Sequence, residues 1–515
     1  MMGFVFAGLS GMFLTLGYAP YSQAWLAWLA LAPVSFYFIL ERQTFWSAFQ
    51  LGYFLGMVHF LSSLLWLTQV SCLGWCVLSA YLAVYPALWV VFWNGRVKSM
   101  QAYTSTAILC CAAEGAFVWI ILEWARGWMF TGFGWNALGV TQHAVWPLIQ
   151  IADLGGVALI SWIVAFVNFI FALHLRRLQL ELKRIQSLKP RLDLIVMIAL
   201  LSLCFVYGVR RMYESFPLKT HLRFLAVQPA IPQDPWKPVP ASEALGTMKQ
   251  LTLQGLAAAP IDLIVWPETP MAASVLAHST FRAIAQEIIQ DRRNALLLGS
   301  NDYVYNKVYN AAMLLQNGTA QIYHKQHLVL MGEYVPFSKQ LPFLRRFVPE
   351  GIDFSHGKSP EILRLANTDL KIAPLICFED TLSDVVRKSL PLRPDLLINL
   401  TNDGWFRRSA AAQQHMDNAL FRAVEYRLPM LRVTNNGITA VISEKGIPIQ
   451  IFRSASGDLH GSGWMKESLA IPLRDSSTFY AQWGNWVPSL GVFFLILMFA
   501  KEYWLWRKKV SKVFL

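Results

Sequence analysis

The sequence predicts a membrane domain of about eight α-helical spans joined to an α/β domain outside the membrane. Of the 515 residues, 55% are hydrophobic and only 15% are charged, whereas soluble proteins carry about 25% charged residues. Long uncharged runs fill the sequence up to residue 209 and return near residue 486, while the sequence between them is polar and mixed. We therefore expect a transmembrane domain at 1–211, an α/β domain at 212–485, and a last span with a basic tail at 486–515.

The uncharged runs determine the number of spans. Residues 1–40 contain no Asp, Glu, Lys or Arg, and a helix of that length measures about 60 Å, twice the hydrocarbon thickness. This run therefore holds two spans with a turn at 18–22. A cleaved signal peptide is the alternative, but it lacks a positively charged n-region. The remaining spans are expected at about 45–67, 77–94, 105–123, 155–175, 192–209 and 486–506.

Positive charges alternate between the predicted turns. Basic residues follow the second, fourth, sixth and eighth spans, whereas the turns at 20–23 and 68–76 carry none and 124–154 carries only Arg126. Because cytoplasmic loops are rich in Lys and Arg, we expect both termini in the cytoplasm and the α/β domain on the opposite side. The net charge of +13 is then largely a topology signal, and no nucleic-acid partner is expected.

Short apolar runs alternate with helical patterns in the α/β domain, which is typical of a sheet covered on both faces. The expected strands are Leu222–Val227, Asp262–Trp266, Ala295–Gly299, Ala311–Gln316, Ile372–Cys377 and Leu396–Leu400. The expected helices are Ala241–Ala257, Thr280–Arg292 with Thr280 as its cap, and Ala411–Tyr426.

Three strand-like runs end in reactive residues, namely Glu268, Lys325 and Cys377. Ligands of α/β domains usually lie at the carboxyl ends of strands, so we expect these residues to converge at one end of a sheet. Taken singly, each has a plain alternative: a solvated carboxylate, a surface lysine or a buried structural thiol. Cys377 is the only cysteine in residues 212–485, and the acidic Glu379 beside it favours a catalytic role.

Other polar residues do not indicate a metal or cofactor. His324 and His327 flank Lys325, but no partner cluster with ligand spacing accompanies them, and there is no phosphate-binding loop or dinucleotide glycine motif. Glu114 lies inside a predicted span, where a carboxylate is a functional candidate by default; we expect it to be paired or structural. Residues 328–354 interleave apolar and basic side chains, which predicts an arm at the membrane interface or, alternatively, a packed loop.

These motifs resemble a known family. Trp266-Pro267-Glu268, Lys325 and Cys377-Phe378-Glu379 resemble the Glu-Lys-Cys triad of the nitrilase, or carbon–nitrogen hydrolase, superfamily. The segments 127–135, 323–329, 332–336, 401–406 and 432–437 are similar to the apolipoprotein N-acyltransferase family. The sequence departs from the family pattern at Leu330-Met331, where Pro-Phe is frequent, and at Phe378, where Tyr is common.

The resemblance implies a nitrilase-like α-β-β-α sandwich and an acyltransferase in a bacterial inner membrane, with the α/β domain in the periplasm. It implies transfer of the sn-1 acyl chain of a phospholipid, typically phosphatidylethanolamine, to the α-amine of the diacylglyceryl-cysteine of apolipoproteins. Cys377 would form a thioester, Glu268 would act as the base and Lys325 would stabilise the oxyanion, with no cofactor. The implied supporting residues are Trp236, Glu333 and Glu379.

Two other functions fit parts of this pattern. A membrane-anchored nitrilase-like amidase would resolve the thioester with water, but seven spans before the domain exceed what an anchor needs. A transporter with a ligand-binding outer domain is expected to show paired repeats and broken helices, and the sequence contains no such pairing.

Overall fold

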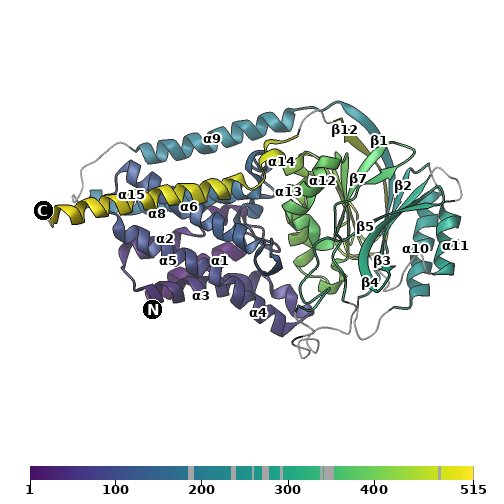
Figure 1. The fold of residues 1–515 in the computed structure, drawn as a ribbon, viewed down its shortest axis with the longest axis horizontal. Coiled ribbons are helices and arrows are strands. Elements are labelled where there is room, and N and C mark those ends of the chain that lie inside the picture. The colour runs from purple at the N-terminus through teal and green to yellow at the C-terminus, as the bar shows by residue number, and fades with distance from the viewer. Residues whose placement is uncertain are drawn as a thin grey trace. The chain divides into compact units, whose positions relative to one another are not determined.

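The chain forms two compact units in the computed structural model: a helical unit, Met1–Tyr213 with Gln482–Leu515, and an α/β unit, Glu214–Ala481 (Figure 1). The structure describes residues 1–183, 191–233, 239–257, 260–268, 278–289, 294–336, 340, 353–473 and 477–513. Trp236 and most of the arm predicted at 328–354 therefore lie outside the described residues.

Apolar helices make up the helical unit. They are α1 Met2–Leu16, α2 Ala32–Leu40, α3 Phe45–Ser63, α4 Cys72–Leu82, α5 Val84–Ser99, α6 Ser105–Arg126, α7 Trp146–Ile149, α8 Ala152–Leu182, α9 Leu192–Tyr213 and α15 Trp486–Val513, with short 3₁₀ turns between some of them. Helix α1 packs on α3, α3 on α5, and α6 on both α8 and α15.

Five helical segments of the described chain are long and apolar enough to cross a membrane: Cys72–Ser99, Ser105–Arg126, Ala152–Leu182, Leu192–Tyr213 and Trp486–Trp504. Met2–Leu16 and Ala24–Leu40 are shorter apolar segments, and α3 lies where another span is predicted. Five candidate spans are therefore established, whereas the count of eight remains a prediction.

Hydroxyl side chains begin several of these helices. The side chains of Thr44, Ser71 and Thr104 accept hydrogen bonds from backbone N–H groups in the first turns of α3, α4 and α6. Such caps satisfy donors that have no partner inside the helix. The polar residues that interrupt the apolar runs thus also set the helix starts.

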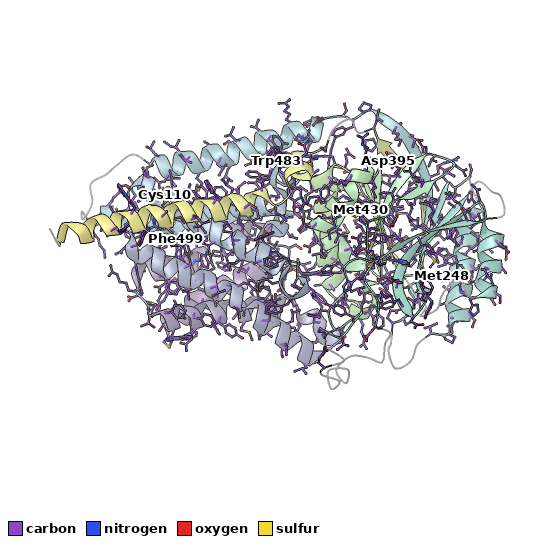
Figure 2. All side chains as sticks on the ribbon, in the orientation of Figure 1. Cys110, Met248, Asp395, Met430, Trp483 and Phe499 are labelled. Carbon is purple, nitrogen blue, oxygen red and sulfur yellow. The ribbon has the colours of Figure 1, made fainter. Side chains whose placement is uncertain are left out.

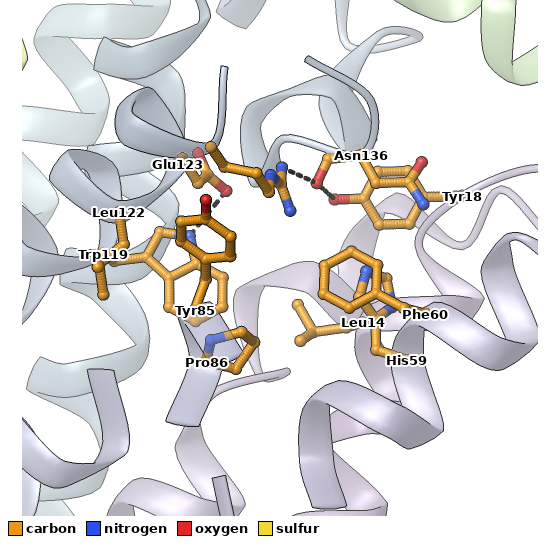
Figure 3. Close-up of a pocket in the computed structure, with 11 residues that line it drawn as sticks. Leu14, Tyr18, His59, Phe60, Tyr85, Pro86, Trp119, Leu122, Glu123 and Asn136 are labelled. Carbon is orange, nitrogen blue, oxygen red and sulfur yellow. Dashed lines mark hydrogen bonds between the residues drawn. The ribbon is translucent and has the colours of Figure 1, made fainter. Parts of the chain in front are cut away.

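Several polar side chains of the helical unit are buried in its interior. Glu114, expected to be paired or structural, forms an ion pair with Arg96, whose Nη2 lies 3.2 Å from Oε1. A small pocket is lined by polar residues that include Tyr18, His59 and Asn136, together with aromatic and aliphatic side chains (Figure 3). Inward-facing polar groups are expected where the outer surface of a helix bundle meets lipid.

Two six-stranded sheets form the centre of the α/β unit. Their strand orders are β12-β1-β2-β3-β4-β5 and β11-β10-β9-β8-β7-β6. The strands are β1 Leu218–Gln228, β2 Leu263–Val265, β3 Ala295–Val304, β4 Lys307–Gln316, β5 Thr319–His324, β6 Leu363–Leu365, β7 Leu370–Ile376, β8 Leu396–Thr401, β9 Met430–Thr434, β10 Ala440–Ile442, β11 Pro448–Ile451 and β12 Gly463–Pro472. The helices of this unit are α10 Ala241–Leu256, α11 Ser279–Ile288, α12 Ser383–Ser389 and α13 Ala411–Tyr426, while α14 Phe479–Trp483 includes the boundary between the two units.

Side chains alternate between a shared core and two outer cores. In β2, Leu263 and Val265 belong to a core that takes residues from both sheets, whereas Ile264 faces a core shared with α10 and α11. A third core joins β7–β9 to α12 and α13; Figure 2 labels Met248 of α10 and Met430 of β9, which belong to these two outer cores. Because both faces of the central strands are covered, these strands are continuously apolar.

The six expected strands are present, with different ends, and helix α13 has the predicted bounds. The prediction of Thr280 as a cap is wrong: Ser279 already belongs to α11, and His278 is the N-cap residue. Strands β6, β10 and β11 went unpredicted because three or four residues carry little periodicity. Strand β12 has two exposed polar residues, Glu467 and Ser468, and it is held by antiparallel pairing with β1.

Candidate active site

Glu268 and Lys325 lie at the same edge of the first sheet. Glu268 follows β2 and Lys325 follows β5. Strand β2 is parallel to β3, and two successive antiparallel pairings make β5 parallel to β3 as well. The carboxyl ends of β2 and β5 therefore share an edge, and Lys325 Nζ lies 3.5 Å from Glu268 Oε1.

Asn310 and Glu333 hold this pair in place. Lys325 Nζ lies 3.0 Å from Glu333 Oε1. The Asn310 amide of β4 donates to Glu268 Oε1 and to Glu333 Oε1, both at 2.9 Å, and the Asn310 carbonyl accepts from the Lys325 backbone N–H. Only 1% of Lys325 and 8% of Glu268 are exposed, so these charges interact with little solvent screening.

Cys377 comes from the second sheet. It directly follows β7 and begins the 3₁₀ turn Cys377–Thr381, with a φ of 51° that only a minority of non-glycine residues adopt. A sharp turn after a strand is a known way to present a nucleophile. Our expectation that the three residues meet at one end of a sheet is therefore wrong in one respect: two sheets supply them, because the sandwich brings two strand ends together.

The thiol reaches the carboxylate across the two sheets. The Cys377 thiol interacts electrostatically with both members of the pair, since Glu268 raises the pKa of the thiol and Lys325 lowers it. The Asn399 amide donates to the Cys377 carbonyl at 3.0 Å. Thiol, carboxylate and ammonium thus influence one another's protonation.

Glu379 fixes the spacing between Lys325 and Cys377. Its carboxylate accepts from the backbone N–H groups of Gln326 and His327, at 2.8 and 3.1 Å, directly after Lys325. It also accepts from the N–H of Ile376 at 2.9 Å, directly before Cys377. Tyr323 of β5 donates to it as well. One fully buried carboxylate therefore clamps the two sheets at the site.

Burial and neighbouring charges shift the acid–base groups of the site. Burial and the nearby Glu333 raise the pKa of Glu268 above its usual range, against the opposing effect of Lys325. Burial and the Glu268 carboxylate likewise raise the pKa of the Cys377 thiol. A thiol of this kind loses its proton most readily to an adjacent base, because the transfer leaves the net charge of the site unchanged.

The lysine remains an ammonium ion. Burial by itself lowers the pKa of Lys325, but the carboxylates of Glu333 and Glu268 more than offset this effect, so the pKa is raised. His327 behaves in the opposite way, since burial and the charge of Lys325 lower its pKa to about 4. A neutral imidazole therefore lies beside a permanent positive charge.

Comparison with known proteins decides the family. Residues 10–170 match the family model described as apolipoprotein N-acyltransferase N-terminal domain, and residues 226–491 match that of carbon-nitrogen hydrolase. An apolipoprotein N-acyltransferase from Geobacter metallireducens is 32% identical over 86% of this chain and 85% of its own length. The chain belongs to the apolipoprotein N-acyltransferase family.

Another relative and a solved structure are also similar to this chain. The apolipoprotein N-acyltransferase of Vibrio parahaemolyticus is 29% identical over 98% of this chain and 97% of its own length. A solved structure of a CN-hydrolase superfamily protein from Xanthomonas campestris is 18% identical and covers 49% of this chain and 91% of that chain, with a TM-score of 0.37. Relatives of this acyltransferase family thus match nearly the whole chain.

Several residues around the candidate site could not be recognised from the sequence. Asn310, Asn399 and Thr401 lie within apolar strands, where a polar residue has no distinctive spacing. The structure brings together Glu268, Lys325, Cys377, Glu333 and Glu379, while Trp236 lies outside the described residues.

The histidines near the site have protein partners. His324 lies 2.7 Å from Asp302, and the ring of His327 stacks with that of Phe378. Within the part of the chain that the structure describes, no group of three or more His, Cys, Asp or Glu residues is arranged to hold a metal ion.

Proposed function

We propose that this chain transfers an acyl chain from a membrane phospholipid, typically phosphatidylethanolamine, to the α-amine of the N-terminal diacylglyceryl-cysteine of apolipoproteins. The observation that carries the proposal is a buried carboxylate–ammonium pair that acts on the charge of a thiol, in a member of this acyltransferase family. An ester acyl group has to be retained until an amine arrives, and a covalent thioester meets that need.

In the first half-reaction the Cys377 sulfur attacks the ester carbonyl at the sn-1 position. Glu268 takes the thiol proton, which its raised pKa favours. The tetrahedral oxyanion is stabilised by the ammonium of Lys325 and a backbone N–H near the nucleophile. As the carbon–oxygen bond breaks, the proton on Glu268 passes to the leaving oxygen, which releases a lysophospholipid and leaves a thioester.

In the second half-reaction the acceptor amine attacks the thioester carbonyl. Glu268 takes a proton from the amine, the amide forms, and Cys377 leaves as a thiolate that recovers the proton. Lys325 again stabilises the oxyanion. All of these steps use groups of the chain and the two substrates, so the proposed mechanism uses no cofactor.

The other site residues act by positioning these three. Glu333, at 3.0 Å, holds the Lys325 ammonium, and Glu379 sets the separation of Lys325 from Cys377. Trp236 retains the supporting role that its family motif implies.

We also propose the eight-span topology in a bacterial inner membrane, with both termini cytoplasmic and the α/β unit periplasmic. The alternation of basic turns supports it. The lipid donor and the lipid-modified acceptor both reside in a membrane, which fits a catalytic unit joined to a multi-span helical unit. Residues 328–354 are proposed as the interfacial arm through which lipid reaches the site.

The test is a reconstituted reaction with purified chain, phosphatidylethanolamine carrying a labelled sn-1 chain, and a diacylglyceryl-peptide acceptor. The expected products are a lysophospholipid and an N-acylated peptide in equal amounts, with neither formed by Cys377→Ala. Release of labelled free fatty acid at the same rate with and without acceptor would instead identify a hydrolase that resolves the thioester with water.

A further inference from the structure

A second group of buried charges lies beside the nucleophile turn. Asp380, Asp403, His415 and Arg432, which we call the tetrad, are each at most 2% exposed. Asp380 lies in the turn that begins at Cys377, and Asp403 follows β8. His415 lies on α13, and Arg432 lies on β9.

The tetrad is a closed ring of four ion-pair contacts. His415 Nε2 lies 2.8 Å from Asp380 Oδ1, and His415 Nδ1 lies 2.8 Å from Asp403 Oδ1. Arg432 Nη1 donates to Asp380 Oδ2 at 2.5 Å, and Nη2 donates to Asp403 Oδ2 at 2.9 Å. Each carboxylate therefore binds both cations, and each cation binds both carboxylates.

This geometry fixes the protonation state of His415. Ionised carboxylates only accept hydrogen bonds, and a neutral imidazole has a single N–H donor. Since both ring nitrogens face a carboxylate, both must carry a proton, and His415 is an imidazolium. The ring then contains two positive and two negative charges, which is how charges are tolerated in a buried site.

The tetrad is directly connected to Cys377. Asp380 belongs to the same 3₁₀ turn as Cys377, and Arg422 of α13 donates to the carbonyl of Thr381 in that turn at 3.0 Å. On the other side, Asp403 lies just after β8, and its negative charge acts on Cys377. The tetrad therefore joins the end of β7 to β8, β9 and α13.

We propose that the tetrad is a positioning device for the nucleophile, in which protonated His415 balances Asp380 and Asp403 so that Cys377 can ionise. Loss of the imidazolium charge leaves a net charge of −1 beside the thiol, which opposes formation of a thiolate. Loss of one carboxylate leaves a net charge of +1, which favours formation of the thiolate.

The direction of the pKa shifts agrees with this assignment. The charge of Asp403 adds to burial and Glu268 in raising the pKa of Cys377, while Lys325 lowers it. Burial and Arg432 lower the pKa of His415, but Asp380 and Asp403 more than offset both, and the result is a pKa of about 9. His415 thus keeps its charge at neutral pH.

The proposal rests on Cys377 as the nucleophile of the proposed function, and its test is chosen to need no substrate. The rate of Cys377 alkylation by iodoacetamide is measured between pH 6 and 10 by mass spectrometry of the Cys377 peptide. The variants are His415→Gln, Asp403→Asn and the double variant, whose ring charges are −1, +1 and 0. His221→Gln is the matched control, since His221 is exposed on β1.

We expect the alkylation profile to move to higher pH by about one unit in His415→Gln and to lower pH by a similar amount in Asp403→Asn. The double variant and His221→Gln should keep the profile of the natural chain. Two results would overturn the proposal: an unchanged alkylation profile in His415→Gln, or a profile of the double variant that is displaced at least as far as that of the more strongly affected single variant. The second result is the one expected if the tetrad is only structural, because the effects of the two substitutions would then add.

Folding does not remove the test. If His415→Gln fails to fold, a double variant that folds with the natural profile supports the charge balance. If the double variant fails as well while Asp403→Asn folds with an unchanged profile, the proposal is wrong. Alkylation does not require acyl transfer, so the two proposals fail in different assays. If the proposed function is wrong but the tetrad proposal is right, the alkylation profile responds to the ring charge and the chain has no transferase activity.

Discussion

Replacing Glu379 by Gln should loosen the clamp between the two sheets. The carboxylate of Glu379 accepts from Gln326 N–H and His327 N–H through Oε1 and from Ile376 N–H through Oε2. A glutamine retains one oxygen, so its amide group must face a backbone donor. If the oxygen stays with the first two donors, Ile376 N–H loses its acceptor.

The magnitude follows from these contacts. A hydrogen bond to a charged group contributes about 1.5–3 kcal/mol, and an unpaired buried N–H costs about 1–3 kcal/mol. We expect Glu379→Gln to lower the free energy of unfolding of the α/β unit by roughly 2–4 kcal/mol, which is on the order of 5–10 °C in unfolding temperature. A shift of about 1 Å between Lys325 and Cys377 can slow the chemistry by about 10²-fold.

Thermal unfolding and single-turnover thioester formation measure the two effects. Tyr323→Phe is the matched control, because it removes one donor to Glu379 and leaves the backbone contacts intact; it should cost about 1 kcal/mol. If Glu379→Gln unfolded at the temperature of Tyr323→Phe and formed thioester at the natural rate, Glu379 would not act as the clamp.

Three other predictions concern the site and the topology. Lys325→Ala should slow thioester formation about 10²–10³-fold and Glu268→Gln about 10²–10⁴-fold; natural single-turnover rates at saturating phospholipid would exclude these roles. Burial lowers the pKa of His327 from 6.5 to about 4, so the unfolded chain takes up a proton at a higher pH than the folded chain does. The free energy of unfolding should therefore hold its full contribution of roughly 3 kcal/mol from His327 above pH 6.5 and lose it as the pH falls toward 4. His327→Gln should flatten this pH dependence, and an unchanged slope would contradict the assignment. The topology is tested on spheroplasts whose chain carries no other exposed cysteine. A membrane-impermeant thiol reagent should label Ser242→Cys and not Lys183→Cys, and the reverse pattern would invert the proposed topology.

Local patterns in the sequence were sufficient to predict the strands that carry the reactive residues. Glu268 and Cys377 end continuously apolar runs, and such runs are strands with both faces covered. Helix α13 was predicted with its bounds, Ala411–Tyr426. The two units also differ in composition, since the helical unit is rich in long apolar runs and the α/β unit is polar and mixed.

Contacts between distant strands were not predictable from local patterns. Cys377 belongs to a different sheet from Glu268 and Lys325, and periodicity does not specify which sheet a strand joins. Asn310 bonds two carboxylates that lie 42 and 23 positions away from it in the sequence. The pairing of His415 with Asp380 depends in the same way on how α13 packs against the Cys377 turn.

The central claim is that Cys377 carries the acyl group between the two substrates, and mass spectrometry of the Cys377 peptide tests it most directly. Incubation with phospholipid alone should add the mass of one acyl chain to this peptide, in a form that hydroxylamine removes. Addition of the diacylglyceryl-peptide acceptor should then discharge the thioester and acylate the α-amine. A Cys377 peptide that stays unmodified in a chain that still transfers the acyl group, or normal transfer by Cys377→Ala, would contradict the mechanism.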